Sequence, residues 1–409
     1  MREMKDSEVK WIGEIPVTWN VYRNKNAFVC SKDLVGGKSS ETQLLSLTTK
    51  GIKLKDINNA EGKLPESFDT YQYVKKDEMV MCLFDLDCSA VFSGLSPYDG
   101  MISPAYKVLT CTDRMEPKYA DYWFQYISHG RKFNHYAKNI RYTLSYEEFS
   151  ALPMLFPDRE EQIRISNYLD AKCSKIDEII EKQHAIIEKL KEYKLSYINE
   201  VTNVNDGIKC HLGFIGQMKN GLNFTDTSEG HKIKFLGVGD FKDNFFVDKE
   251  EMFSTIISEE NVAEDYMLHS GDIVFVRSNG SKELVGRAVM VNGIEYPVTY
   301  SGFCIRFRNI RPDIIDSKFL LYYFRSLDFR KQLEKYSQGS NISNLNQDLL
   351  SSLQFTIPSK DYQKRRLDEM EIKCKEIDNA VIKFEGMNNK LQEYKKSLIY
   401  EVVTGKKEV

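Results

Sequence analysis

Apolar residues recur at heptad spacing in two stretches of the chain, residues 162–201 and 363–402. The positions in the first stretch are Ile176, Ile179, Ile186, Leu190, Tyr193 and Tyr197, and those in the second are Ile377, Ala380, Phe384, Met387, Leu391, Tyr394 and Leu398. Neither stretch contains proline, and both are rich in Glu, Lys, Leu and Ile, so both are predicted to be helical. The spacing predicts the a/d seam of a coiled coil over roughly three to four heptads.

Polar residues interrupt this seam at Gln183 in the first stretch and at Gly386, Asn388 and Asn389 in the second. At 1.5 Å per residue, each helix would be roughly 60 Å long. Two ordinary core helices of a bundle are the alternative, although such helices usually run to about a dozen residues.

The second stretch is a copy of the first. The run from Lys189 to Val201 returns from Lys390 to Val402, and Cys173 returns as Cys374. The offset is constant (374 − 173 = 201), so no residue has been gained or lost across roughly forty positions, as expected of an internal repeat.

Short β-rich runs alternate with turn residues before each helix. In residues 20–157 the predicted strands are Gln43–Thr48, Met79–Phe84 and Ala105–Leu109, followed by an aromatic-rich helix at Tyr119–Phe133. In the second half the predicted strands are Phe235–Val238 and Ile273–Arg277, followed by a helical stretch at Asp316–Leu333. Lys318-Phe319-x-x-Tyr322-Tyr323-Phe324 mirrors Lys118-Tyr119-x-x-Tyr122-Trp123-Phe124 (318 − 118 = 200). The second globule therefore repeats the plan of the first, more loosely than the helices do.

We predict an α+β fold in which two similar mixed α/β globules are separated by an antiparallel coiled coil of two long helices, with an internal pseudo-two-fold repeat. The predicted boundaries are 1–157 for the first globule, 158–204 for the first long helix, 205–358 for the second globule and 359–405 for the second long helix. The antiparallel arrangement is expected because it relates the two globules by an approximate two-fold axis.

Composition excludes several classes of protein. The net charge of −3 argues against a protein that coats nucleic acid indiscriminately. No run of eighteen apolar residues or apolar signal core is present, so we expect a cytoplasmic chain with no membrane partner. The eight cysteines are scattered without zinc-ligand spacing, so we expect no metal site.

Two features of the chain resemble a known family. The first is Trp11-Ile12-Gly13-Glu14-Ile15-Pro16-x-x-Trp19, which we interpret as an apolar clip folded onto a domain. A second feature is Pro157-Asp158-Arg159-Glu160-Glu161-Gln162 at the start of the first long helix. With the duplicated layout, these features resemble the DNA-specificity subunit of type I restriction–modification systems over essentially the whole chain. The second copy departs from the pattern, because Asp361-Tyr362-Gln363 keeps the glutamine but not the two glutamates before it.

The resemblance implies a DNA-reading subunit without catalysis of its own, in which each globule is a target-recognition domain. The implied partners are double-stranded DNA with a bipartite site, two methyltransferase subunits and restriction/translocase subunits. No cofactor is expected on this chain, with S-adenosylmethionine on the partner methyltransferase and ATP and Mg on the partner restriction subunit. The seam residues Ile176, Ile186, Leu190, Tyr193, Ile377, Met387, Leu391 and Tyr394 are expected to serve the coiled coil or partner contacts.

Candidate DNA contacts are the Arg, Lys, Asn and Gln side chains of loops, with Ser and Tyr to hold phosphates. In the first globule these are Ser103, Lys138, Asn139, Arg141 and Tyr142. In the second they are Arg277, Asn279, Ser281, Lys282, Arg287, Tyr300, Ser301, Gln338, Ser340 and Asn341. The stretches 138–142 and 336–341 both precede the segment that leads into a long helix.

Three other functions compete with the DNA reader. A coiled-coil adaptor would explain the helices but not two duplicated globules rich in polar loops. A methyltransferase or nuclease is opposed by missing motifs, because Gly237 and Gly239 are not followed by a methyltransferase target-amine motif. Gly37-Lys38-Ser39 also lacks the first glycine of a phosphate-binding loop, since Lys32 stands there. The specificity subunit of a methyltransferase-only or related restriction system also remains open.

Overall fold

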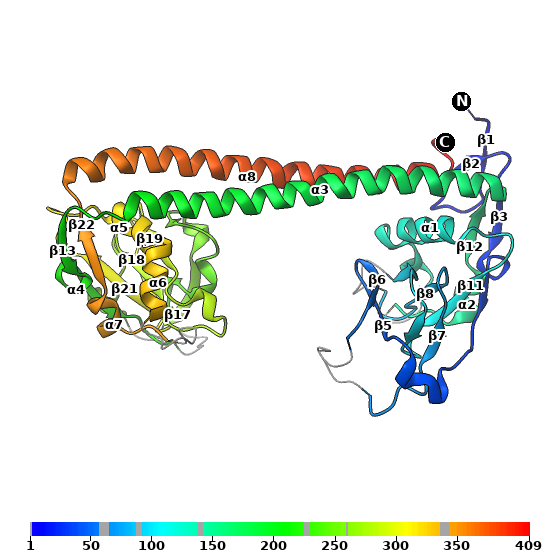
Figure 1. Ribbon diagram of the computed structural model, residues 1–409, viewed down its shortest axis with the longest axis horizontal. Coiled ribbons are helices and arrows are strands. Elements are labelled where there is room, and N and C mark those ends of the chain that lie inside the picture. Colours follow the sequence, from blue (N-terminus) through cyan, green and yellow to red (C-terminus); the bar gives the residue numbers. More distant parts are fainter. Residues whose placement is uncertain are drawn as a thin grey trace. The chain divides into compact units, whose positions relative to one another are not determined.

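A computed structural model describes residues 2–56, 65–86, 92–137, 142–224, 230–258, 261–335 and 344–409. The chain divides into two compact units (Figure 1): unit 1 contains Met1–Gln183 and Glu385–Val409, and unit 2 contains His184–Phe384. Each unit combines a globule of mixed strands and helices with segments of the two long helices. The predicted α+β fold class is confirmed.

The globule of unit 1 is built on a four-stranded antiparallel sheet in the order β4-β11-β8-β9. Its strands are β4 (Phe28–Cys30), β8 (Met79–Met81), β9 (Ser93–Leu95) and β11 (Lys107–Cys111). Four strand pairs surround it: β1 (Met4–Asp6) with β2 (Glu14–Pro16), β3 (Asn20–Arg23) with β12 (Pro153–Phe156), β5 (Leu45–Thr48) with β6 (Gly51–Leu54), and β7 (Gln72–Val74) with β10 (Gly100–Ile102). Helices α1 (Pro117–His129) and α2 (Tyr146–Ala151) complete the globule.

The globule of unit 2 has a five-stranded sheet in the order β14-β21-β18-β19-β16. Its strands are β14 (Gly216–Asn220), β16 (Phe246–Val247), β18 (Ile273–Val276), β19 (Ala288–Val291) and β21 (Cys304–Asn309). A second sheet, β17-β15-β20, contains β15 (His231–Leu236), β17 (Ser254–Ser258) and β20 (Val298–Tyr300), while β13 (Ile208–His211) pairs with β22 (Gln354–Ile357). Its short helices are α4 (Leu212–Ile215), α5 (Ser317–Phe324), α6 (Leu327–Lys335) and α7 (Gln347–Ser352).

The two globules share a common set of strands in the same pairing. In unit 1, Phe156 of β12 pairs with Asn20 of β3. In unit 2, Ile357 of β22 pairs with Ile208 of β13, and the offset is again 201 (357 − 156 = 201). The order β4-β11-β8-β9 likewise corresponds to β14-β21-β18-β19. The loose repeat predicted for the globules is therefore present in the sheets.

The aromatic helical stretch of unit 2 differs from its prediction as a single segment, because it is two helices. α5 ends at Phe324 and α6 begins at Leu327. Between them, the Ser326 hydroxyl accepts a hydrogen bond from the Phe329 amide at 3.3 Å. A serine that satisfies a free amide in this way starts a new helix, so the side chain at position 326 sets the break.

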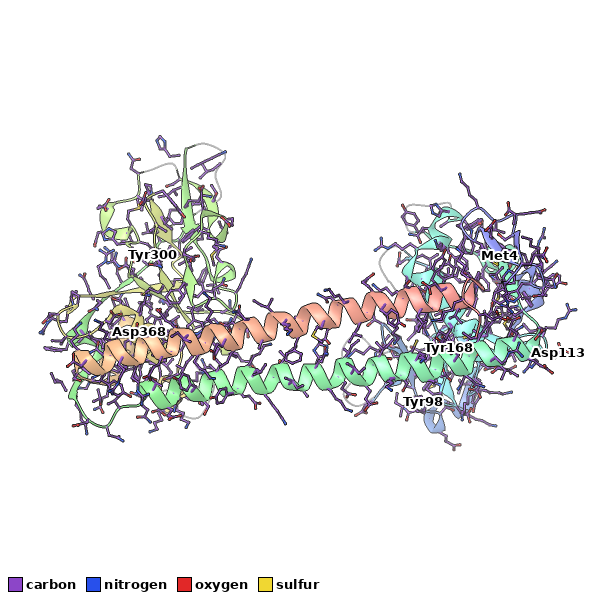
Figure 2. The ribbon with its side chains drawn as sticks, turned by 90° about the horizontal axis from the view of Figure 1, so that it is seen from above. Met4, Tyr98, Asp113, Tyr168, Tyr300 and Asp368 are labelled. Carbon is purple, nitrogen blue, oxygen red and sulfur yellow. The ribbon has the colours of Figure 1, made fainter. Side chains whose placement is uncertain are left out.

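Each long helix spans 44 residues, α3 from Arg159 to Thr202 and α8 from Lys360 to Val403. Within unit 1, the Tyr119 hydroxyl lies within 3.4 Å of both the Leu155 and Val403 carbonyl oxygens, so the start of α3 lies near the end of α8. Within unit 2, the Tyr362 hydroxyl donates to the Val201 carbonyl at 3.0 Å, which joins the start of α8 to the end of α3. In each unit the two helices lie side by side and antiparallel, as predicted (Figures 1 and 2).

The buried face of the helices differs from the predicted seam by one residue at alternate positions. Ile176 and Ile377 are buried and Leu190 and Leu391 are half-buried, as predicted. Ile186, Tyr193, Met387 and Tyr394 are 41–54% exposed, so their assignment to the seam was wrong. The residues that replace them on the inner face are Ile187, Lys194, Asn388 and Lys395. The error arises because Ile179-Ile180 and Ile186-Ile187 are adjacent apolar pairs, and heptad spacing does not say which member points inward.

Two equivalent salt bridges hold the helices together. In unit 1, Lys395 Nζ lies 2.6 Å from Asp177 Oδ2, and in unit 2, Lys194 Nζ lies 2.7 Å from Asp378 Oδ2. The pairs are related by the repeat offset (177 + 201 = 378; 194 + 201 = 395). Each lysine stem is mostly buried along the seam while its ammonium reaches the partner helix, so the pairs favour the antiparallel register.

We expect the charge reversal Lys194→Glu to destabilise the helix pair of unit 2 by about 1 kcal/mol, because it replaces an ion pair by a repulsion. The double variant Lys194→Glu, Asp378→Lys should recover most of that loss. Thermal unfolding of the single and double variants measures the coupling. Equal stability of the two variants would show that this ion pair does not contribute.

Candidate nucleic-acid interface

Four chain segments of unit 2 meet where β18 ends and β21 begins. We call this group the edge cluster: residues 222–223, 277–281, 301–303 and 344–345. The Arg277 amide donates to the Phe303 carbonyl at 2.7 Å, and the Leu345 amide donates to the Arg277 carbonyl at 2.8 Å. The Gly302 amide donates to the Leu222 carbonyl at 2.7 Å. Backbone hydrogen bonds therefore fix all four segments to one another at one edge of the sheet.

Two glycines allow this close approach. A Cβ at Gly221 would lie 2.3 Å from the Ser301 carbonyl oxygen, and a Cβ at Gly302 would lie 2.1 Å from Asn223 Oδ1. At Gly221 the neighbour is backbone, so a side chain there would push the segments apart, whereas at Gly302 a side chain would displace the Asn223 side chain. Packing of the cluster therefore requires glycine at position 221.

The edge cluster presents groups that suit a DNA base edge. Arg277 is half-buried with its Nη1 3.5 Å from the Gly302 carbonyl oxygen. Asn279 is half-buried, and its side-chain oxygen accepts from the Ser281 amide at 2.8 Å. Phe303, whose carbonyl accepts from the Arg277 amide, is 58% exposed. Arginine and asparagine read base edges through hydrogen bonds, and phenylalanine contacts the thymine methyl group.

Three basic residues of β14 and β21 are bound to neighbours within the globule. Arg306 is fully buried and its Nη1 donates to the Asp265 carbonyl at 2.9 Å. Arg308 binds Asp272 through two hydrogen bonds of 2.8 and 2.7 Å, and these bonds raise the pKa of its guanidinium. Lys219 binds Asp265 and lowers the pKa of that carboxyl. These three side chains therefore stabilise the sheet, and Arg277 is the cation of the edge cluster.

Several residues of unit 2 that were predicted to contact DNA are instead buried or bound to other residues of the globule. Tyr300 is fully buried and its hydroxyl lies 3.3 Å from the Lys219 carbonyl oxygen, and burial raises the pKa of this phenol. Ser301 is 8% exposed and accepts from the Phe303 amide, so both support the cluster from within. Arg287 Nη1 binds the Lys242 carbonyl at 2.6 Å and Asp243 at 3.1 Å. The backbone of Lys282 begins a short 3-10 turn, and Gln338, Ser340 and Asn341 lie outside the described residues.

Unit 1 has an equivalent edge at the end of β8. The Leu144 amide donates to the Leu83 carbonyl at 2.8 Å, which corresponds to the bond between Leu345 and Arg277 (345 − 144 = 201). Phe84 and Tyr106 stack here, with ring centroids 6.0 Å apart. Ser103 is half-buried nearby, and its carbonyl oxygen accepts from Gln72 at 3.3 Å. Tyr142 is half-buried with a positive φ of 45°, and Lys138, Asn139 and Arg141 lie outside the described residues.

Phe303, Asn223 and Asn344 were missed from the sequence. Phe303 stands in a β-rich run beside Gly302 and Cys304, so only the end of the strand pairing reveals that it points outward. Asn223 and Asn344 are distant in sequence and come together through Leu222 and through the bridge between Ser278 and Asn344. The repeated spacing in the sequence does not predict contacts between residues this far apart.

The N-terminal clip, defined as residues 2–19, packs on unit 1. Trp19 is fully buried and donates through Nε1 to Glu161 Oε2 at 2.8 Å, and Arg2 binds the same carboxylate. The Trp11 ring lies 6.0 Å from the Trp123 ring, and its Nε1 donates to the Tyr136 hydroxyl at 2.8 Å. The predicted packing of both tryptophans onto the domain is confirmed.

A glutamine at each helix start fixes the long helix to its globule. Gln162 is fully buried; its Oε1 accepts from the Glu116 amide at 2.8 Å, and its Nε2 donates to the Arg114 and Pro157 carbonyls. Gln363 makes the same three bonds, to Asp316, Ile314 and Pro358. The second copy therefore attaches in the same way although Tyr362 replaces the preceding glutamate.

Within the described ranges, no three His, Cys, Asp or Glu side chains are grouped so as to hold a metal ion. Among the same residues, no helix combines the length and apolar character needed to cross a membrane.

Residues 210–399 match the model of the type I restriction modification DNA specificity domain. The matched segment begins in β13 and ends within α8. The type I restriction enzyme StySPI specificity subunit of Salmonella potsdam is 25% identical over 300 residues, covering 65% of this chain and 63% of that protein. The EcoKI specificity subunit of Escherichia coli (strain K12) is 25% identical over 146 residues, covering 36% of this chain and 31% of that protein.

These matches make the chain similar to type I restriction–modification specificity subunits, and the family model covers residues 210–399. It spans less than two thirds of the length of both curated relatives, 63% and 31%. A solved chain described under complex assembly and conformational transition of the type I R-M system superposes with a TM-score of 0.72, at 13% identity, covering 96% of this chain and 99% of that chain. This likeness shows the same fold.

Proposed function

We propose that this chain is the sequence-reading subunit of a type I restriction–modification complex, and that each globule, residues 1–157 and 205–358, reads one half of a bipartite DNA site. The family match carries this proposal. Equivalent loop clusters at the ends of β8 and β18 support it, because both globules then present polar loops at the same place on a common sheet. The globules differ in those loops, as two readers of different sequences must.

We further propose that the chain has no catalysis of its own and acts through partners. Two methyltransferase subunits would bind one chain, because the repeat gives each unit a similar helix segment and helix start. S-adenosylmethionine would bind to those subunits, and ATP and Mg to the restriction/translocase subunits. The exposed side chains of Ile186, Tyr193, Met387 and Tyr394 are available for such contacts.

A gel shift on DNA with two half-sites, with the purified methyltransferase partner present, tests the reading function. We expect a discrete complex whose formation requires both half-sites. A chain that binds the partner but gives no sequence-dependent shift would be a coiled-coil adaptor. S-adenosylmethionine binding to the purified chain alone would instead indicate an enzyme.

Native mass spectrometry tests the proposed stoichiometry. We expect two methyltransferase subunits per chain at saturation, because α3 and α8 carry equivalent segments related by a constant offset of 201 (374 − 173). The Gln162→Ala and Gln363→Ala variants provide a matched pair, and each should weaken binding of one subunit. Saturation at a single partner would contradict the proposal.

The gap between the half-sites is proposed to depend on the helices that run from one unit into the other. We expect seven residues, one heptad, inserted into α3 after Ala185 and into α8 after Gly386 to keep the seam and lengthen each helix by roughly 10 Å. The optimum gap should grow by about three base pairs, since base pairs rise about 3.4 Å each. Selection of bound DNA measures both quantities. Altered half-site sequences with an unchanged gap would refute this role of the helices.

A further inference from the structure

The inner faces of the two long helices differ in polarity at only two neighbouring positions. Each inner position of α3 between residues 173 and 194 is buried or half-buried and has an equivalent in α8 at the offset of 201. Gln183 is replaced by Phe384 (183 + 201 = 384), and Ile187 is replaced by Asn388 (187 + 201 = 388). The other inner positions keep their character in α8; in α3 they are Cys173, Ile176, Ile180, Leu190 and Lys194.

Gln183 and Asn388 lie at the same level of the helix pair in unit 1. Counted from the Asp177–Lys395 ion pair, Gln183 is six residues further along α3 and Asn388 is seven residues back along α8 (183 − 177 = 6; 395 − 388 = 7). In antiparallel helices these steps lead in the same direction, by roughly 9 and 10.5 Å. The two amide side chains therefore occupy one layer of the seam.

The equivalent layer of unit 2 is apolar. The same count from the Lys194–Asp378 ion pair places Ile187 opposite Phe384. Ile187 is 3% exposed, and Phe384 is half-buried. The seam therefore matches amide with amide in unit 1 and apolar side chain with apolar side chain in unit 2.

The two amides of unit 1 are buried where only each other can satisfy them. Gln183 is 8% exposed and Asn388 is 5% exposed. Among the described residues, Gln183 Oε1 and both polar atoms of the Asn388 amide have no hydrogen-bond partner. Because the side chains share a layer, a change of rotamer can pair them, whereas an apolar residue opposite either one would leave a buried amide unpaired.

The ion pairs do not distinguish a long helix from its repeat. α3 carries both Asp177 and Lys194, so the α3 helices of two chains, antiparallel in the same register, would form both ion pairs with each other. In that arrangement Gln183 of each helix would face Ile187 of the other. Two α8 helices would likewise bury each Asn388 amide against a phenylalanine ring.

We propose that Gln183 and Asn388 select the pairing of α3 with α8 and exclude the pairing of either helix with its own copy in a second chain. A polar residue at a single seam position sets the partner and the register of a coiled coil. Here it acts by disfavouring the wrong partner, since each mispaired helix pair would contain two unpaired buried amides. This inference does not depend on what the globules bind.

The competing partner exists before the chain is complete. The core of the unit 1 globule includes Ile399 and Val402, near the end of α8. α3 carries the same residue types at the equivalent positions, Ile198 and Val201. The α3 helix of a second chain can therefore compete for this core as long as the chain's own α8 is unmade or unfolded.

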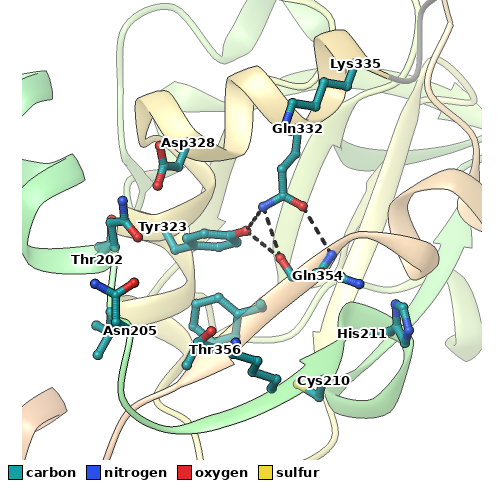
Figure 3. Close-up of a pocket in the computed structure, with 14 residues that line it drawn as sticks. Thr202, Asn205, Cys210, His211, Tyr323, Asp328, Gln332, Lys335, Gln354 and Thr356 are labelled. Atoms are coloured by element: carbon teal, nitrogen blue, oxygen red, sulfur yellow. Dashed lines mark hydrogen bonds between the residues drawn. The ribbon is translucent and has the colours of Figure 1, made fainter.

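Folding of the unit 2 globule removes this competitor. The Asp328 amide donates to Asn199 Oδ1 at 2.8 Å, and Thr202 lines a cavity together with Tyr323 and Thr356 (Figure 3). These contacts engage the end of α3. The choice of partner is therefore made while the long helices are still unpaired, as they also are at the start of refolding from denaturant.

Zero-length cross-linking by a carbodiimide distinguishes the pairings, because it joins a carboxylate to an amine only where the two form an ion pair. The full-length chain is refolded over a range of concentrations, cross-linked, and analysed by peptide mass spectrometry. The native pairing joins Asp177 to Lys395. Pairing of two α3 helices joins Asp177 to Lys194, which lie roughly 25 Å apart on one helix and so cannot react within it (194 − 177 = 17). We expect the parent chain to give the native product.

Gln183→Ile makes the seam between two α3 helices fully apolar and places isoleucine against Asn388 in the native pairing. We expect the Asp177–Lys194 product to rise at least ten-fold above its level in the parent chain and to increase with protein concentration. Exchange of α8 between two chains keeps the native residue pairs, so exchange alone does not form this product. The double variant Gln183→Ile, Asn388→Ile removes the mismatch, so it should unfold at no lower temperature than the parent chain and still form the product.

Leu190→Ala is the matched control, because it weakens the same seam without changing either of the two layers. Circular dichroism establishes that each variant refolds, and the double variant provides the test if Gln183→Ile does not. The Asp177–Lys194 product should stay at the parent level in Leu190→Ala. A rise in this control equal to that in Gln183→Ile would overturn the proposal, as would absence of the product from both isoleucine variants at every concentration.

Discussion

Replacement of Gln162 by alanine is expected to destabilise unit 1 by about 3 kcal/mol, because three backbone groups lose their hydrogen-bond partner. The side chain is 0% exposed and joins Glu116, Arg114 and Pro157. Gln363→Ala should have the same effect on unit 2, where the bonds to Asp316, Ile314 and Pro358 are 2.8–2.9 Å long.

Hydrogen–deuterium exchange separates the two effects. Protection of α1 should fall in Gln162→Ala, and protection of α5 should fall in Gln363→Ala. Arg164→Ala and Lys364→Ala alter exposed neighbours on the same helices and should leave both patterns unchanged. Equal loss of protection in both units from either glutamine variant would show that the two attachments do not act separately.

Replacement of Arg277 by alanine should weaken DNA binding at one half-site by roughly ten-fold or more, since a base-reading arginine accounts for about 1–3 kcal/mol of discrimination. The other half-site should be read as before. Binding selections with the methyltransferase partner present measure the preference at every base position. Arg141→Ala is expected to act on the other half-site in the same way.

Arg311→Ala is the matched control, because it removes the same charge beyond the opposite end of β21. Arg311 is bound to Asp313 by two hydrogen bonds of 3.0 and 2.9 Å, and the edge cluster lies at the Cys304 end of the strand. A base contact predicts that preference changes in Arg277→Ala alone. If both variants bound all DNA sequences more weakly, and their affinity depended less on salt, Arg277 would contact a phosphate or act through the overall electrostatic field of the protein.

The long helices and the order of the chain were predictable because their signals extend over many residues. A heptad pattern and a constant offset each repeat across a 44-residue helix, so local exceptions do not obscure them. The strands Met79–Met81 and Ile273–Val276 were also found, because apolar β-rich runs mark buried strands. The break between α5 and α6 was not predicted, because it depends on one serine hydroxyl.

The composition of the candidate interface was less predictable, because burial at a sheet edge depends on where pairing stops. Tyr300 and Phe303 are aromatic residues three positions apart in one run. Tyr300 is fully buried under β14, and Phe303 is 58% exposed. Loop position pointed to Arg277 and Asn279, which both lie in the edge cluster, and their contact with DNA stays a prediction. The hydrogen bonds that bring Asn223 and Asn344 beside them come from segments far apart in sequence.

The adjacent isoleucines of α3 have a consequence for the folding landscape. Ile180 and Ile187 are 7% and 3% exposed, while their neighbours Ile179 and Ile186 are 38% and 41% exposed. A rotation of the helix by about 50°, half the angle between successive residues, would exchange Ile180 and Ile187 for Ile179 and Ile186 and keep Ile176 and Leu190 inward, so hydrophobic burial alone leaves two packings close in energy. The Lys194–Asp378 and Lys395–Asp177 pairs exist in only one of them. Their main contribution is therefore to remove frustration, by making a single rotational state of the helix pair the native one.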